Sequence, residues 1–257
     1  MVLGLMCPAA AGDWVDLSAG DGLQGWKVEC VETDRGKSYW SQKGGVIECD
    51  TKGDKGHDYV WLVSEREFGD FELEVLVRTF PGRKGNSGIQ FRSRYGQHPE
   101  HPEKGGWLHG PQVDIHPPGP WRSGLIYDET WEARRWISPS LANWKIGKEK
   151  APADWRWVHA DGSVALSEGR REFAGAPDAP DRDGWNHVRI LARGTLVQVE
   201  VNGIEVTHYD GKGVLDDAAH QRHRVGMRGH IAFQLHARND LKIQFKEVRI
   251  RDLGSPD

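Results

Sequence analysis

The sequence lacks several features that would each indicate a particular class of protein. It has no apolar run of the ~18 residues that a membrane-spanning helix needs, and only 3 of its 257 residues are cysteine. The net charge is −4, and no dense cluster of lysine and arginine suggests nucleic acid or an anionic membrane as a partner. No glycine-rich phosphate loop follows a strand, so we expect no bound nicotinamide cofactor. The partner is expected to be small and neutral rather than polyanionic.

The first twelve residues, MVLGLMCPAAAG, are typical of the end of a secretory leader, because an apolar stretch precedes small residues. The stretch has no basic region and a short apolar run, so we interpret it as the remnant of a leader that starts upstream. Cys30 and Cys49 then form an even pair, which suits either a disulfide in an oxidising compartment or two buried free cysteines. We predict a periplasmic or secreted protein, with residues 13–257 forming one domain.

Alternation of apolar and polar side chains recurs along the chain and predicts β-strands almost throughout. In FELEVLVR, residues 71–78, the apolar side chains share one face and the charged ones share the other. Asn202-Gly203 is the dipeptide that a two-residue type I′ hairpin prefers. The apolar phase slips between Phe245 and Val248, as a β-bulge would cause. Antiparallel strands without intervening helices predict an all-β, two-sheet antiparallel sandwich of the jelly-roll kind. Further strands are expected at 185–192, 196–201, 229–236 and 241–253.

Residues 128–182 differ from the rest of the chain, because strand alternation gives way to a segment with five tryptophans among many charges. A long excursion of this kind in a compact domain is usually functional or disordered, and the tryptophans argue against disorder. We therefore predict an ordered, Trp-rich loop insertion with short hairpins that packs over one mouth of the sandwich.

Strand parity also places a set of polar side chains on one sheet surface. A solvated outer face would explain them, but amide, acid, guanidinium and imidazole groups recur there in place of a lysine and glutamate mixture. Small residues on the same strands, Gly88, Gly124 and Ala232, would leave room for a ligand. We therefore predict a binding site on this surface. Its predicted members are Arg92, Gln112, Asp114, Gln234 and His236.

Five stretches occur together in a fixed order: NSGIQFRS, GPQVDI, SGLIYDE, DGWNHVRILARG with VEVNGIEV, and GHIAFQLH with LKIQFKEVRIRDL. As a set, from about Trp14 to Leu253, the chain resembles the 3-keto-disaccharide hydrolase domain family. That resemblance implies a concanavalin-like jelly roll in an exported bacterial protein of sugar catabolism. Many members carry Glu-x-Gln where this chain has Gln112-Val113-Asp114, and an Asp where Leu235 precedes His236.

The chemistry expected of such a site is elimination rather than ordinary glycoside hydrolysis. A glycosidase needs two carboxyl groups at a fixed separation, and only Asp114 falls on the predicted polar face. In a 3-keto sugar the ketone acidifies the C2 proton, so one base can start the loss of the C1 substituent. We predict His236 or Asp114 as the base, Arg92 as the group that holds the enolate oxygen, and Tyr127 or a water as the acid.

Amide side chains would orient the sugar hydroxyls, and a tryptophan, Trp131 or Trp136, would stack on the sugar ring. The sequence requires no cofactor. A divalent ion remains an option for polarising the ketone, although the histidine-rich loop 98–109 is better read as solvated. A separate sugar 3-dehydrogenase would have to make the ketone. The alternative function is a non-catalytic carbohydrate-binding module of the same fold, which would need no convergent His, Asp and Arg. The amide side chains that we expect to orient the sugar hydroxyls are those of Asn86, Gln90, Gln112 and Gln234.

Overall fold

The structure is a computed structural model that describes residues 12–254 except 81, 84, 99, 117–121, 138–155, 159–163 and 167–183. Strands dominate it, as the alternation predicts. One set of strands is β1 (Trp14–Asp16), β3 (Trp40–Lys43), β4 (Val46–Asp50), β6 (Asp70–Thr79), β14 (Trp185–Arg193), β15 (Leu196–Val201), β16 (Ile204–Asp210) and β18 (Lys242–Gly254). The other set is β2 (Trp26–Cys30), β5 (Val60–Phe68), β7 (Ser87–Gln97), β8 (Gly106–His109), β9 (Pro111–Ile115), β10 (Ile126–Asp128), β11 (Arg135–Trp136) and β17 (Gly229–Leu235).

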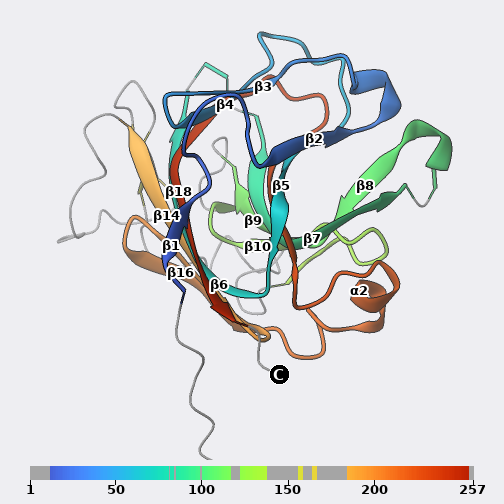
Figure 1. The fold of residues 1–257 in the computed structure, drawn as a ribbon, viewed down its shortest axis with the longest axis vertical. Coiled ribbons are helices and arrows are strands. Elements are labelled where there is room, and N and C mark those ends of the chain that lie inside the picture. The colour runs from blue at the N-terminus through green and yellow to red at the C-terminus, as the bar shows by residue number, and fades with distance from the viewer. Residues whose placement is uncertain are drawn as a thin grey trace, which may run out of the picture.

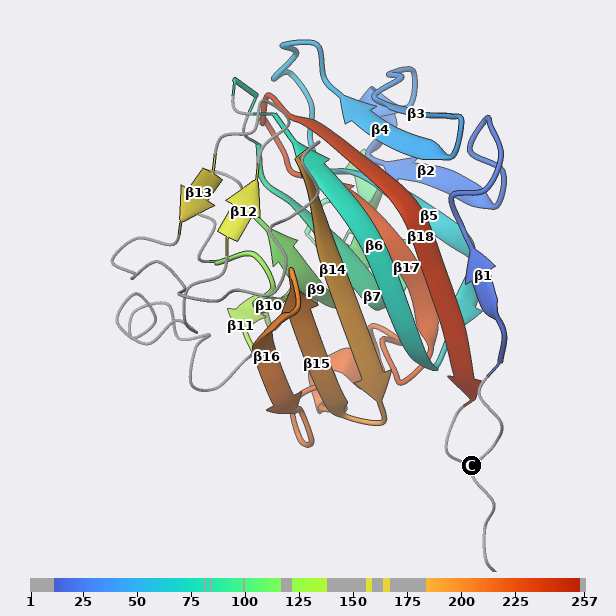
Figure 2. The same cartoon turned by 90° about the vertical axis from the view of Figure 1, so that its left-hand side faces the viewer.

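These strands form two antiparallel sheets packed face to face, which confirms the predicted sandwich (Figure 1). The first sheet has the order β16-β15-β14-β6-β18-β4-β3, with β1 paired to β18. The second has the order β11-β10-β9-β7-β17-β5-β2, with β8 paired to β7. Figure 2 shows the first sheet from its outer side, with the long strands β14, β6 and β18 side by side. Helix α2 (Ala218–Arg222) and the short 3-10 turns Glu32–Asp34 and Pro102–Lys104 lie in connections.

The core fills the space between the sheets, because each central strand turns every second side chain inward. On β6, Phe71, Leu73, Val75 and Val77 are fully buried in this core, as predicted. Phe233 of β17 stacks on a phenylalanine of β18 with ring centroids 4.0 Å apart, so the two sheets interlock through aromatic contacts. Among the described residues, no helix is long and apolar enough to cross a membrane.

Local turn chemistry follows the predictions as well. Asn202 and Gly203 have φ values of 52° and 76° between β15 and β16, which fits a type I′ hairpin. In β18 the register with β6 shifts between Lys246 and Arg249, at the predicted bulge. Cys30 and Cys49 are both buried free thiols, so the structure has the second of the two alternatives for this pair.

Most of the predicted insertion 128–182 lies outside the described residues, and so does the predicted leader remnant except Gly12. The described parts of the insertion are residues 128–137, which include β11, and a hairpin of β12 (Arg156–Val158) with β13 (Val164–Leu166). Residues 129–137 follow β10 and include β11, the edge strand of the second sheet, and three of them, Glu129, Arg134 and Trp136, contribute side chains to a cavity.

Candidate active site

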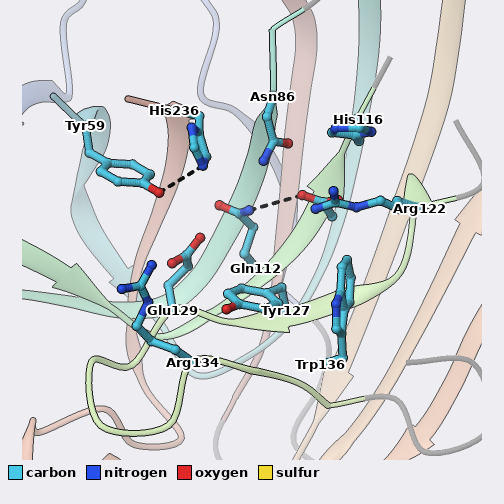
Figure 3. A pocket seen from close by; sticks show the side chains of 11 residues that line it. Tyr59, Asn86, Gln112, His116, Arg122, Tyr127, Glu129, Arg134, Trp136 and His236 are labelled. Carbon is cyan, nitrogen blue, oxygen red and sulfur yellow. Dashed lines mark hydrogen bonds and ion pairs between the residues drawn. The ribbon is translucent and has the colours of Figure 1, made fainter. Parts of the chain in front are cut away.

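A cavity of about 370 Å³ lies on the outer face of the second sheet, beyond the core (Figure 3). On β9, Val113 and Ile115 enter the core while Gln112 and Asp114 point the other way into the cavity. Of the residues proposed from the sequence, the cavity brings together Asn86, Gln112, Asp114, Tyr127, Trp136 and His236. It also contains side chains that the sequence reasoning did not propose: Tyr59, His116, Arg122, Glu129 and Arg134.

Glu129, the first residue after β10, is the most unusual ionisable group in the cavity. Its side chain is buried, and Oε1 accepts a hydrogen bond of 3.2 Å from Nε2 of Gln234. Oε2 is buried without a hydrogen-bond partner among the described residues. Burial raises the pKa of the Glu129 carboxyl to about 7, with a further contribution from Asp114 and against the effects of Gln234 and Arg134. A carboxyl with such a pKa can exchange a proton near neutral pH.

Asp114 is also fully buried, but both of its oxygens have partners. Arg122 donates from Nε to Oδ2 over 3.0 Å, and Gln112 lies 3.5 Å from Oδ1 through Nε2. Burial raises the pKa of Asp114 to about 6, even though Arg122 lowers it. At neutral pH the group is therefore mostly ionised and held by its arginine, which suits orientation better than proton transfer.

His236 follows β17 and forms a pair with Tyr59, which precedes β5. The Tyr59 hydroxyl and His236 Nε2 are 2.9 Å apart, as Figure 3 shows. On the other side of the ring, Nδ1 lies 3.1 Å from the Asn239 side-chain amide. Tyr59 is itself fixed by stacking on Trp61, with ring centroids 5.6 Å apart. Burial lowers the pKa of His236 and raises that of Tyr59, so both groups are neutral at pH 7.

One wall of the cavity is aromatic. The rings of Tyr127 and Trp136 meet edge to face, with centroids 5.2 Å apart, and the Arg122 guanidinium lies 5.0 Å from the Trp136 ring. Arg134 stands on the opposite side of Tyr127, next to Glu129 in Figure 3. Aromatic faces beside amide and charged groups form the kind of surface that binds a sugar ring and its hydroxyls.

Arg92 does not line this cavity. It lies midway along β7, and its buried guanidinium donates to the carbonyls of Gly69 and Gly194 over 2.9 and 2.6 Å and to Asp70 Oδ1 over 2.9 Å. The strand alternation that placed it on the outer face is broken by a bulge: Arg92 has φ of 51°, and the register of β7 with β17 shifts between Gln90 and Ser93. The predicted grouping of Arg92 with Asp114 and His236 is therefore wrong.

Gln90, Gln234 and Trp131 lie behind the cavity wall rather than in it. Gln90 faces outward as predicted, but β8 folds over it and the Leu108 carbonyl accepts from its Nε2 over 3.2 Å. Gln234 reaches the site through Glu129. Trp131 packs against Trp107, with ring centroids 5.0 Å apart, in an aromatic cluster under β8.

The small residues do not leave room for a ligand in the way the sequence suggested. A Cβ on Gly88 would lie 2.2 Å from Cδ of Gln112, so the missing side chain makes room for Gln112. Gly124 faces Val206 of the first sheet, and Ala232 belongs to the aromatic cluster. Among the described residues, no group of three or more His, Cys, Asp or Glu side chains is arranged to hold a metal ion.

The architecture agrees with that of a solved structure. No curated protein matches the chain. A proposed glycosyl hydrolase from Parabacteroides distasonis has a similar crystal structure, with a TM-score of 0.51, 17% identity and 94% of each chain covered. Carbohydrate-binding module CBM66 from Bacillus subtilis gives a TM-score of 0.41 at 14% identity, over 88% of this chain and 94% of that one.

The family comparison covers nearly the whole chain and agrees with the motifs. Residues 13–251 match the family model of the 3-keto-alpha-glucoside-1,2-lyase-like domain. This range includes both sheets and every residue that lines the cavity. The chain therefore belongs to the 3-keto-alpha-glucoside-1,2-lyase-like domain family.

Proposed function

We propose that this protein cleaves the glycosidic bond of 3-keto glycosides by elimination across C1 and C2, followed by hydration. One observation carries the proposal: Glu129 lines a cavity of sugar size, and its buried carboxyl has a pKa of about 7 and one oxygen without a hydrogen-bond partner in the described part of the chain. The family of the chain and the polar, partly aromatic lining support the same substrate class.

In the first step, Oε2 of Glu129 takes the C2 proton, and the electrons of the C2–H bond move into the C3 ketone to give an enolate. The enolate then collapses, which restores the C3 carbonyl, forms a C1=C2 double bond and expels the C1 oxygen substituent. Water adds to C1 and a proton returns to C2, so the net reaction is hydrolysis. Glu129 replaces His236 and Asp114, the two bases that the sequence suggested, because its pKa fits proton transfer near pH 7.

The Tyr59–His236 pair supplies the acid in this proposal. A neutral tyrosine hydroxyl joined to a neutral imidazole over 2.9 Å can protonate the leaving oxygen and be reprotonated through the ring. The Arg134 guanidinium, which stands beside Glu129, stabilises the charge on the enolate oxygen in the role first expected of Arg92. Ionised Asp114, Gln112 and Asn86 orient sugar hydroxyls.

The experiment compares a 3-keto glucoside with its parent glucoside and follows release of the aglycone. We expect turnover of the ketone only, because without it the C2 proton is far too weakly acidic for a carboxylate. Deuterium at C2 should slow the reaction or exchange with solvent. Equal rates for the two glycosides would contradict the mechanism, since no step would then need the ketone.

Binding of glycosides without cleavage of either would instead favour the carbohydrate-binding module. The cell would also have to oxidise the sugar at C3 with a separate dehydrogenase, because the proposed reaction consumes a ketone and produces none.

A further inference from the structure

A second hollow, of about 610 Å³, lies on the same side of the molecule and shares no lining residue with the candidate active site. It is bounded by β2, by β7 with β8, by β17, and by α2 and the residues that follow it. We refer to it as the basic cleft. The candidate active site does not use it, and the proposed reaction gives it no task.

The charges that line the basic cleft all have one sign. Lys27, Arg94, Arg222 and Arg224 line it, and no Asp or Glu is among the described residues that do. This concentration is local, because the chain as a whole carries a net charge of −4. A hollow with cationic walls attracts an anion more strongly than the same charges on a flat surface would.

The acidic partners of these cations do not fill the cleft. Lys27 pairs with Glu29 over 2.8 Å, Arg94 pairs with Glu67, and Arg222 pairs with Glu132, each as an ion pair on partly exposed side chains. Exposed pairs of this kind contribute little, so a ligand oxygen can share or replace the carboxylate at small cost. Within the part of the chain that the structure describes, the Arg224 guanidinium has no hydrogen-bond or ion-pair partner. It is therefore available to a ligand.

The size of the cleft, and the uncharged side chains that line it beside the cations, fit a sugar rather than a small inorganic ion. Its volume exceeds that of the candidate active site and falls in the usual range for small-molecule sites. His109 and His223 stack with ring centroids 4.0 Å apart and an interplanar angle of 17°, which gives the cleft a flat wall. Burial and His223 lower the pKa of His109 to about 3, so its ring stays neutral.

We propose that the basic cleft is a second binding site, for an anionic sugar that carries a carboxylate or a sulfate. The cationic side chains hold the oxyanion, with Arg224 and Arg222 as its principal donors. The flat imidazole wall and Tyr95 contact the sugar ring. The site is independent of turnover, so the proposal does not rest on the elimination reaction.

Isothermal titration of the whole protein at pH 7 and fixed ionic strength tests this with four probes: glucuronate, glucose 6-sulfate, inorganic sulfate and glucose. We expect saturable binding of the two anionic sugars, which added salt weakens, and binding at least tenfold weaker for the other two probes. Arg224→Met and Arg222→Met should each weaken glucuronate binding by about tenfold or more, as loss of a charge-assisted hydrogen bond does. Arg249→Met is the matched control, because it removes an exposed arginine of the first sheet.

Each alternative result has a meaning. Inorganic sulfate that binds as tightly as the sugar acids would overturn the assignment to a sugar. Equal affinity for glucose and glucuronate, or no change in either arginine variant, would overturn the site itself. Trp136→Ala, in the candidate active site, should leave glucuronate binding intact. Loss of glucuronate binding in this variant would assign the ligand to the candidate active site instead. Imidazole nitrogen-15 resonances of His223 in the unaltered protein should shift with glucuronate and stay unmoved with glucose.

Discussion

Two buried ionisable side chains of the second sheet, Arg92 in the middle of β7 and Glu129 directly after β10, differ in how far their polar atoms are paired. Arg92 is 2% exposed, and its donors reach two turn carbonyls and the Asp70 carboxylate. Glu129 is 4% exposed and keeps one oxygen without a partner among the described residues. Burial lowers the pKa of Arg92 only to about 10, so it remains a cation, whereas burial brings the pKa of Glu129 to about 7.

The difference separates a structural charge from a reactive one. Arg92 joins β7 to the β5–β6 and β14–β15 turns, and Asp70 Oδ1 also accepts from the Gly194 backbone over 2.9 Å. Such a satisfied group stabilises its surroundings and offers nothing to a ligand. Glu129 lines a cavity and has one buried oxygen without a partner among the described residues, and its pKa is raised because burial disfavours the charged carboxylate. Burial alone does not identify a site; at Glu129 burial coincides with an unpartnered oxygen among the described residues and with a position in the cavity wall.

The largest expected effect is on turnover at Glu129. Glu129→Gln keeps the shape and the contact with Gln234 but removes the base, so kcat for a 3-keto glucoside should fall by ~10²–10⁴-fold. Steady-state kinetics measure this, with Glu74→Gln on the outer face of the first sheet as the matched control. Full activity in Glu129→Gln would show that Glu129 is not the base and that its buried carboxyl is not a reactive group.

Arg92→Met should affect stability rather than chemistry. Removing one partner leaves Asp70 buried without its cation, which costs ~3–5 kcal/mol of unfolding free energy. Urea denaturation measures the loss, and kcat of the folded fraction should remain unchanged. Adding Asp70→Asn should recover part of the stability, because the uncompensated charge is gone. A large fall in kcat with normal stability would instead return Arg92 to the reaction.

The pH dependence of stability offers a smaller, separate test. The pKa of Glu129 is raised from its ordinary 4.5 to about 7, so the folded protein binds a proton that the unfolded chain releases. Its contribution to the free energy of unfolding is fully present below pH 4.5 and is lost as pH rises through 7, a change of about 3 kcal/mol. Glu129→Gln should flatten this slope and be the more stable protein at pH 8. Denaturation midpoints of both proteins at pH 5 and pH 8 measure this. The same dependence of stability on pH in both would show that the Glu129 carboxyl does not cause it.

The smallest effect is expected from Gly88→Ala. The added Cβ would collide with the Gln112 side chain, and overpacking of this kind costs ~1–3 kcal/mol. Because Gln112 lines the cavity and contacts Asp114, KM for the 3-keto glucoside should rise while kcat changes less. Gly36→Ala, at a turn where no atom lies within 4 Å of the new Cβ and φ is not positive, controls for the loss of a glycine. Identical KM values in both variants would show that Gln112 does not position the substrate.

The sequence predicts the sheets well because alternation reports burial directly. It identifies the inward side chains of β6, the Asn202-Gly203 hairpin and the bulge of β18. For the same reason it places Gln112, Asp114 and Tyr127 on the cavity side of their strands. The alternation predicts the wrong side of the sheet for Arg92, because a bulge reverses the direction of its side chain. Nothing in the alternation of IQFRS signals this bulge.

The residues that the sequence reasoning missed come mostly from outside the strands. Tyr59 precedes β5, and Glu129 and Arg134 follow β10, where periodicity carries no information about direction. For Glu129 a signal was present, since the acid directly follows Tyr127-Asp128 in a motif that the resemblance had already marked. The raised pKa that makes it a candidate base depends on burial beneath distant segments, which no local pattern encodes.

The two buried thiols can report how often the strands of each sheet open. Cys30 lies in β2 at the edge of the second sheet, and Cys49 lies in β4 of the first sheet. Burial raises the pKa of both thiols, so neither is a reactive thiolate while its strand is in place. In a Cys7→Ser background, the rate at which a thiol reagent labels each sulfur reports how often that strand opens. Edge strand β2 should be labelled first, so the two sheets would reveal their separate opening rates without any engineered cysteine.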